Sequence, residues 1–175
     1  MKTRCLIGTS GFYYQHWYGK FYPRKLKKED LLSYFAGRFN TVELNSTFYR
    51  LPHEKTVENW FKRVPPEFIF AVKGSRFITH TKKLVNLDDS IDIFLARVRL
   101  LKQKLGPLLY QLPPGLKKDN KRLAAFLKRL PPDTRNVIEF RNLSWLDKEI
   151  FAILKDYNVA PVSYTHLTLP TKRIV

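Results

Sequence analysis

Short apolar segments alternate along this chain with amphipathic segments of helical period, and this alternation constrains the fold more than any other feature. The apolar segments predict strands at 6–10, 41–46, 68–73, 107–112 and 137–140, with a sixth beginning near 159–162. The intervening segments place apolar residues on one side of a helix, at 29–39, 54–64, 88–105, 119–130 and 147–157. Strand, helix, strand in steady repetition predicts an α/β protein with parallel strands and helices outside them. Gly106 is expected to end the long helix 88–105.

Two architectures satisfy such a repeat: an open doubly wound sheet and a (β/α)₈ barrel. The central strands of an open sheet are hydrophobic on both faces, whereas several of these strands carry polar residues near their carboxyl ends. A barrel mouth accommodates that pattern, so we favour a TIM-barrel-like fold. The first strand ends in Gly8-Thr9-Ser10-Gly11, but neither GxGxxG nor a phosphate-loop lysine follows, so a nucleotide-binding motif has little support.

The composition fits one globular domain in the cytoplasm. The chain has 175 residues, of which 44% are hydrophobic and 14% aromatic, enough for a sizeable core, and no linker divides it. No apolar run approaches the roughly 20 residues of a membrane helix, and the first apolar stretch stops after Ile7, too early for a secretory signal. Cys5 is the only cysteine, which excludes an intrachain disulfide and a thiolate zinc site.

The chain is strongly basic, with 32 Lys and Arg against 15 Asp and Glu and a net charge of +17. A field of this sign attracts phosphates, nucleic acids and acidic surfaces. The basic residues are spread over predicted helix ends and loops, and no recognition-helix or ribonucleoprotein motif is present. This distribution favours solvated helix faces over a dedicated nucleic-acid groove as the explanation of the charge.

Side-chain alternation places a small or polar group late on the same side of each strand. In 41–46, for example, Glu43 and Asn45 share one side, while Val42 and Leu44 share the other. In a barrel these groups would converge at the carboxyl-terminal mouth, where barrel enzymes keep their active sites. The convergent set is Ser10, Glu43, Asn45, Lys73, Gln111, Glu139 and Arg141. The alternative is a buried polar network that only stabilises the top of the barrel.

Glu43, Glu139 and Lys73 are the candidate catalytic residues. The cations Lys73 and Arg141 would keep both carboxylates ionised, which disfavours the general-acid role of a glycosidase. The same acids favour a charged Lys73 and so disfavour a Schiff base. A metal would find only Glu43, Glu139 and His80 as ligands, so a divalent metal is not favoured and any cofactor stays unidentified.

Loops after the strands add candidates for substrate binding. The segment 11–19 is rich in aromatic residues, and Trp17 within it would stack a flat ring or a sugar unless the segment is a packed lid. Arg76 and His80, just past the third strand, suit an anionic group such as a phosphate. Trp145 follows the fifth strand, where it either contacts a substrate or packs against the first turn of the next helix.

Five motifs in order resemble the YecE-like family, known as domain of unknown function seventy-two. They are IGTSGFYYQHWYGKFYP (7–23), FNTVELNSTFYRLP (39–52), FIFAVKGSRFITHTKKL (68–84), LGPLLYQLPP (105–114) and VIEFRNLSW (137–145). The resemblance implies a TIM-barrel-like fold and names no reaction. The polar motif positions that it implies are Glu43, Asn45, Lys73, Arg76, His80, Gln111, Glu139 and Arg141, which largely coincide with the set from alternation.

The resemblance stops near residue 161. Members of the family continue through several more βα units, whereas 162–175 looks unlike them. About five βα units are fewer than the eight of a complete barrel. We therefore expect residues 1–161 to form a partial, incomplete barrel domain and residues 162–175 to be a non-native or disordered tail.

These observations predict an enzyme-type barrel that binds a small anionic or phosphorylated molecule. Glu43 or Glu139 would serve as the acid–base residue, and Lys73, Arg76, His80 and Arg141 would hold the anion. Two alternatives stay open: a nucleic-acid-associated basic protein, and a structural scaffold without catalysis. The sequence predicts no membrane partner and does not specify the substrate, the reaction or the oligomeric state.

Overall fold

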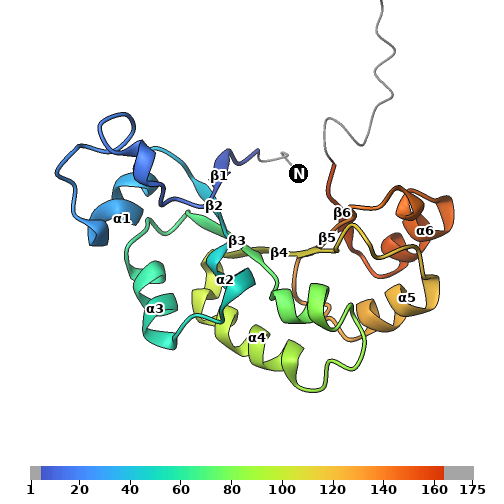
Figure 1. Cartoon of the computed structure of the whole chain (residues 1–175). Coiled ribbons are helices and arrows are strands. Elements are labelled where there is room, and N and C mark those ends of the chain that lie inside the picture. Colours follow the sequence, from blue (N-terminus) through green and yellow to red (C-terminus); the bar gives the residue numbers. More distant parts are fainter. Residues whose placement is uncertain (1–4, 164–175) are drawn as a thin grey trace, which may run out of the picture.

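A parallel sheet forms the centre of the computed structural model, which describes residues 5–163 (Figure 1). Its strands are β1 (Gly8–Ser10), β2 (Thr41–Leu44), β3 (Ile69–Lys73), β4 (Leu105–Gln111), β5 (Asn136–Glu139) and β6 (Ala160–Pro161). They lie in the order β1-β2-β3-β4-β5-β6, and every neighbouring pair is parallel. The predicted α/β organisation with parallel strands is therefore confirmed.

Helices connect consecutive strands and cover the outer face of the sheet. The longer ones are α1 (Leu31–Ala36), α3 (Glu54–Lys62), α4 (Ser90–Val98), α5 (Asn120–Lys128) and α6 (Lys148–Asp156). The short turns are η1 (Gln15–Trp17), η2 (Lys28–Asp30), α2 (Ser46–Tyr49), η3 (Phe77–Thr81), η4 (Arg99–Lys104) and η5 (Leu143–Trp145). Figure 1 shows the longer helices arranged around one side of the sheet, as in a TIM-barrel-like fold, and the sheet of the described residues is not closed. No helix within residues 5–163 combines the length and apolar character that a membrane crossing requires.

The two faces of the sheet differ sharply in burial, because side chains alternate along each strand. The helix-covered face consists of Val42, Leu44, Phe70, Val72, Leu108, Tyr110 and Ile138, each at most 2% exposed. The opposite, inner face is partly exposed and carries Thr41, Glu43, Ile69, Lys73, Gln111 and Val137. A closed barrel encloses this inner face, so the polar residues selected by alternation lie on the barrel-interior side.

The segment 88–105, which the pattern predicts as one long helix, is divided in the structure. α4 ends at Val98, and the chain continues as the 3₁₀ turn η4, in which Lys102 has a φ of +49°. The ammonium group of Lys104 is buried and donates to the carbonyls of Phe61 and Val64, at 2.7 and 2.6 Å. This contact holds η4 against the end of α3. Because it joins segments that are far apart in the sequence, the local pattern of apolar residues cannot predict it.

Gly106 lies within β4 and does not end that helix. A Cβ atom at this position would lie 2.4 Å from Cγ2 of Ile69 and 2.9 Å from the carbonyl oxygen of Phe70. Glycine therefore permits β3 and β4 to approach closely at the point where their register shifts. The predicted strand 41–46 is also shorter, since β2 ends at Leu44 and α2 begins at Ser46.

The expected tail falls mostly outside the described residues, which end at 163. The division into a partial barrel domain, 1–161, and a tail, 162–175, therefore stays a prediction. Within the described part, the last strand ends at Pro161.

We expect Tyr110→Phe to leave stability unchanged or to raise it by up to about 1 kcal/mol. The Tyr110 ring packs against Phe94 and Phe126, and its buried hydroxyl has no hydrogen-bond partner among the described residues. Tyr22→Phe is the matched control, because the Tyr22 hydroxyl donates to the carbonyl of Phe12; its loss should cost about 1 kcal/mol. Urea denaturation measures both. A loss of more than about 1 kcal/mol in Tyr110→Phe would show that a buried water satisfies the hydroxyl.

Candidate functional site

The inner face brings side chains from β1 to β5 to the carboxyl edge of the sheet. Ser10 lies opposite Glu43 in the strand register, and Gln111 lies opposite Glu139. Lys73 is the last residue of β3. These residues end their strands or come within one residue of the end. They form three separate groups rather than one continuous network.

The first group, called here the Ser10 group, joins Ser10, Glu43 and Asn45. The Ser10 hydroxyl donates to Oε1 of Glu43 at 2.8 Å and accepts a hydrogen bond from Nδ2 of Asn45 at 2.6 Å. Ser10 thereby uses its single proton on the carboxylate. Within the described residues no hydrogen bond reaches Oε2 of Glu43, so this oxygen is available to a ligand.

The second group, the Glu139 group, centres on a carboxylate that is only 4% exposed. Its Oε1 accepts from Nε2 of Gln111 and pairs with Nε of Arg141, each at 2.5 Å. The i, i+2 spacing of Glu139 and Arg141 puts both on the same side of an extended chain, as alternation predicts. A buried carboxylate needs such partners, because an unpaired buried charge is costly.

The third group, the Lys73 group, contains Lys73 and His80 on the ring of Phe48, together with Arg76, whose charge acts on His80. Nζ of Lys73 lies 5.1 Å from the centroid of the Phe48 ring, and the His80 ring meets the same ring edge-on at 5.0 Å. Neither Lys73 nor Arg76 forms an ion pair with a carboxylate in the described part of the chain. Two cations therefore stand close to a histidine without a compensating acid.

The surroundings of His80 favour the neutral form of its ring, and its contact with Thr79 favours one tautomer. Burial, followed by the charges of Arg76 and Lys73, lowers the pKa of His80 below its ordinary value of 6.5. Its Nδ1 lies 2.9 Å from Oγ1 of Thr79, and that hydroxyl donates to the carbonyl of Ser75 at 3.3 Å. Because a hydroxyl has one proton, we assign the proton between the side chains to Nδ1 of His80. Nε2 is then left as an acceptor.

The backbone around His80 is unusual. η3 is a single π-helical turn, a conformation that is rare and frequent at functional sites. The loop after it has four non-glycine residues with φ between +43° and +70°, namely Lys83, Leu84, Asn86 and Asp88. Such conformations are costly, and they persist where the surrounding structure requires them, often at ligand sites. This strain singles out the segment that positions His80.

The two tryptophans proposed from sequence as substrate contacts both make packing contacts within the described residues. Trp145 has no exposed surface; it stacks on Phe140 with centroids 5.0 Å apart, and its Nε1 donates to the carbonyl of Leu116 at 2.7 Å. Full burial agrees with a packing role for Trp145, and its stacking and hydrogen-bond partners are Phe140 and Leu116 rather than the first turn of the next helix. Trp17 is partly buried and packs against Tyr14 and Phe21, at 4.8 and 5.4 Å.

Sequence reasoning missed two residues that hold the site together. Oγ1 of Thr47 lies 2.8 Å from the carbonyl of Leu44 and 2.6 Å from that of Lys73, so it joins the ends of β2 and β3. Phe48 supplies the ring on which Lys73 and His80 meet. Both lie in α2, within four residues of the end of β2, and a search of the residues just beyond each strand would have included them.

The residues considered from sequence as metal ligands, Glu43, Glu139 and His80, belong to the three different groups. Across residues 5–163 no cluster of three or more His, Cys, Asp or Glu side chains has an arrangement that could hold a metal ion. The side chains at the carboxyl edge are instead suited to hydrogen bonding and to pairing with an anion.

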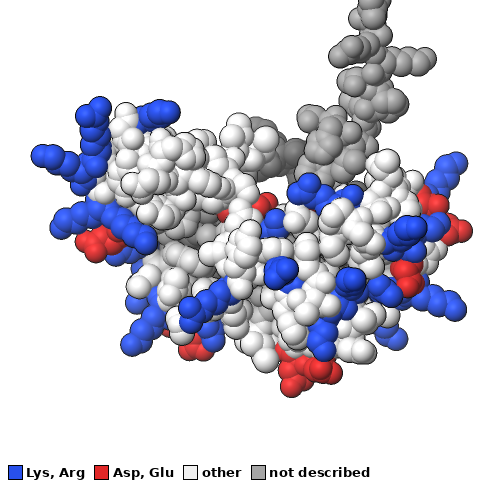
Figure 2. All heavy atoms as spheres, viewed as in Figure 1, with Lys and Arg blue, Asp and Glu red and all other residues white. Residues whose placement is uncertain are grey.

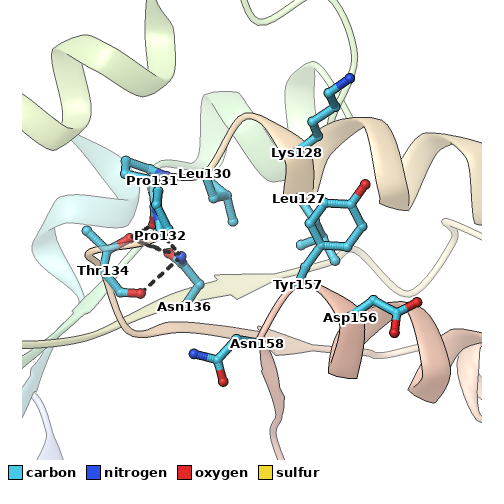
Figure 3. A pocket seen from close by; sticks show the side chains of 10 residues that line it. All are labelled: Leu127, Lys128, Leu130, Pro131, Pro132, Thr134, Asn136, Asp156, Tyr157 and Asn158. Carbon is cyan, nitrogen blue, oxygen red and sulfur yellow. Dashed lines mark hydrogen bonds between the residues drawn. The ribbon is translucent and has the colours of Figure 1, made fainter.

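A cavity of about 370 Å³ lies away from these groups, at the amino edge of the sheet (Figure 3). It is bounded by the ends of α5 and α6, with Leu127 and Tyr157 among its lining residues, and by the segment that leads into β5. The amide of Asn136 there donates to Thr134, so its hydrogen bonds stay within the protein. In TIM barrels this edge contributes to stability and not to catalysis, and we assign no chemistry to it.

Lysine and arginine side chains are scattered over the visible face of the molecule and form no single stripe (Figure 2). This distribution agrees with the solvated-helix explanation of the charge of +17. Overall charge therefore does not locate the site. The side chains around Lys73 locate the candidate site better than the overall charge does.

Known proteins match this chain over most of its length. Residues 6–171 match the family described as protein of unknown function DUF72. The UPF0759 protein YunF of Bacillus subtilis (strain 168) is 30% identical over 138 residues, covering 74% of this chain and 49% of YunF. The UPF0759 protein YecE of Escherichia coli (strain K12) is 31% identical over 118 residues, covering 67% of this chain and 43% of YecE. The chain thus spans about half the length of the curated relatives it matches.

Solved structures agree with the sequence comparison. The crystal structure of a DUF72 family protein from Thermotoga maritima MSB8 has a TM-score of 0.79 and 28% identity, and the match covers 89% of this chain and 63% of that one. A DUF72 family protein from Enterococcus faecalis V583, at 21% identity, shares the fold with a TM-score of 0.68, over 89% of this chain and 61% of that one. The chain, with its motifs and its TIM-barrel-like arrangement, belongs to the DUF72 family.

Proposed function

We propose that the carboxyl edge of the sheet binds a small anionic molecule, such as a phosphate ester, at the Lys73 group. The observation that carries this proposal is the presence of two cations beside the His80 ring, with no carboxylate paired to either cation in the described residues. Like charges held near one another are unfavourable unless an anion joins them. A phosphate or sulfate oxygen would accept hydrogen bonds from Lys73 and Arg76 together.

Glu43 is the better placed of the two carboxylates to act on a bound molecule. It is partly exposed, and its only hydrogen bond from a described side chain comes from Ser10, to one oxygen. Glu139 is buried and shares Oε1 between Gln111 and Arg141, which suits an anchor that fixes the ends of β4 and β5. We therefore assign the acid–base role to Glu43 and the role of a structural anchor to Glu139.

Sulfate should raise the pKa of His80, because an anion held by Lys73 and Arg76 removes the repulsion that opposes protonation of the ring. The folded ring starts with a pKa below 6.5, and the anion favours its charged form. Linkage then requires sulfate to bind more tightly as the pH falls through the His80 pKa. Sulfate keeps its charge over this range, unlike phosphate, so an NMR titration of the His80 ring protons with and without sulfate reports the coupling cleanly.

Lys73→Met should weaken sulfate binding about tenfold, which corresponds to about 1.4 kcal/mol. Lys62→Met is the matched control, because Lys62 lies at the end of α3, away from the carboxyl edge, and its loss should change nothing. An unchanged His80 pKa in the presence of sulfate would refute the anion site.

The nucleic-acid alternative makes a different prediction. Binding to random duplex DNA through dispersed Lys and Arg would show a steep salt dependence and would be the same for the parent, Lys73→Met and Glu43→Gln. Binding of sulfate that depends on Lys73, with duplex binding absent or unaffected, favours the small-anion proposal.

The scaffold alternative is tested by comparing the Glu139 and Lys73 groups. Arg141→Met should lower the free energy of unfolding by about 1–3 kcal/mol, since it leaves the buried Glu139 carboxylate with fewer partners. Adding Glu139→Gln to Arg141→Met should recover part of that loss, which a double-mutant cycle in urea measures. Lys73→Met should change stability by less than about 0.5 kcal/mol. If Lys73→Met is as destabilising as Arg141→Met, the Lys73 group is also structural.

A further inference from the structure

A cavity of about 260 Å³ opens beside the Ser10 group, between the loop that follows β1 and the loop that follows β2. The residues that line it include Phe12, Tyr13, Tyr14, Asn45, Ser46 and Trp60. Aromatic side chains make up half of its lining residues, beside the amide of Asn45 and the hydroxyl of Ser46. A cavity of this size is smaller than the roughly 300–1,000 Å³ of pockets that hold a whole ligand, so it fits part of a ligand, such as a single ring.

The aromatic walls are held in place before any ligand binds. Gly11 has a φ of +83°, which favours glycine, and its N–H donates to the carbonyl of Glu43 at 2.8 Å. The Tyr14 hydroxyl donates to the carbonyl of Ser10, and the Tyr22 hydroxyl donates to the carbonyl of Phe12. These bonds fix the loop after β1 on the ends of the strands. A preorganised pocket loses less entropy when it binds a ring.

The chemistry of the lining selects a planar ring with a polar edge. Aromatic side chains bind flat rings through stacked and edge-to-face contacts. Asn45 uses its Nδ2 on Ser10. Among the described residues no hydrogen bond reaches Oδ1 of Asn45, so this oxygen can accept from an N–H or O–H group of a ring. A saturated apolar chain would use neither feature.

The cavity lies next to the proposed anion site. Asn45 directly follows β2 and Lys73 ends β3, and neighbouring strands are about 5 Å apart. Thr47 joins the two strand ends, because its Oγ1 lies 2.6 Å from the carbonyl of Lys73. The cavity and the Lys73 group therefore lie at the carboxyl ends of neighbouring strands, which is the arrangement that a ligand spanning both would need.

We infer that this cavity is the subsite for a planar aromatic or heteroaromatic ring, so that the ligand at the carboxyl edge is a ring-bearing anion such as an aromatic phosphate ester. This inference rests on the proposed function, because it assigns the ring of the same ligand whose anionic group contacts Lys73. It names a class of ligand that an anion site alone does not specify.

Three probes separate the ring from the anion: phenyl phosphate, methyl phosphate and phenol. We expect phenyl phosphate to bind at least about tenfold more tightly than methyl phosphate, because the ring adds contacts worth about 1.4 kcal/mol. Calorimetry gives the affinities. The indole N–H resonance of Trp60, assigned with Trp60→Phe, should shift with phenyl phosphate and phenol but not with methyl phosphate.

Two tyrosines give a matched pair of variants that leave the core intact. Tyr13 lines the cavity and is 45% exposed, whereas Tyr49 is 79% exposed and does not line it. Tyr13→Ser should remove most of the preference for phenyl over methyl phosphate. Tyr49→Ser should retain that preference in full.

The outcomes distinguish the ring subsite from the anion site. Equal affinities for phenyl and methyl phosphate, or an unshifted Trp60 resonance with phenol, would overturn the ring subsite while leaving the anion proposal intact. If methyl phosphate and sulfate both fail to perturb His80 while phenol still shifts Trp60, the anion proposal fails and the ring subsite stands. Equal loss of preference in Tyr13→Ser and Tyr49→Ser would also count against the ring subsite.

Discussion

Val42, Val72 and Ile138 point from β2, β3 and β5 into the helix layer, and their complete burial fixes which way every other side chain of the sheet faces. A slip of one residue in any strand would exchange the two faces and force a group such as Glu43 into that apolar layer. The cost of burying a carboxylate there keeps the register fixed. The geometry of the carboxyl edge is therefore set by the hydrophobic core on the other side of the strands.

This constraint explains how far the sequence alone could go. Period-two alternation assigns Glu43, Lys73 and Glu139 to one face and one edge, and the structure places them there. It also anticipates the contact between Glu139 and Arg141, two residues apart. Alternation does not say which neighbours touch across strands. The sequence argument gave Lys73 an acidic partner, whereas in the structure its Nζ lies over the ring of Phe48.

Contacts between distant segments account for the remaining errors. Trp145 donates to a carbonyl 29 residues away, and Lys104 to one 40 residues away. Neither contact leaves a periodic trace in the sequence, so a substrate role for Trp145 and an unbroken helix through Lys104 were both reasonable from local pattern. The loop after β1 is a similar case, because its aromatic residues both pack together and line a cavity, and composition does not separate these two uses.

The groups at the carboxyl edge differ in how many hydrogen-bond and ion-pair partners their charged side chains have, and not in how many charges they carry. Glu139 has its Oε1 shared by two donors and little contact with solvent, so changing its charge would disturb the ends of β4 and β5. Among the described residues, Glu43 has one oxygen without a donor, and Lys73 forms no ion pair with an acid. Groups whose interactions are already satisfied stabilise the fold, whereas groups left unsatisfied gain free energy when a ligand arrives. At the ends of β4 and β5 the donors and acceptors are matched, which favours a rigid edge. At the ends of β2 and β3 some of them are unmatched, so these groups can bind a ligand.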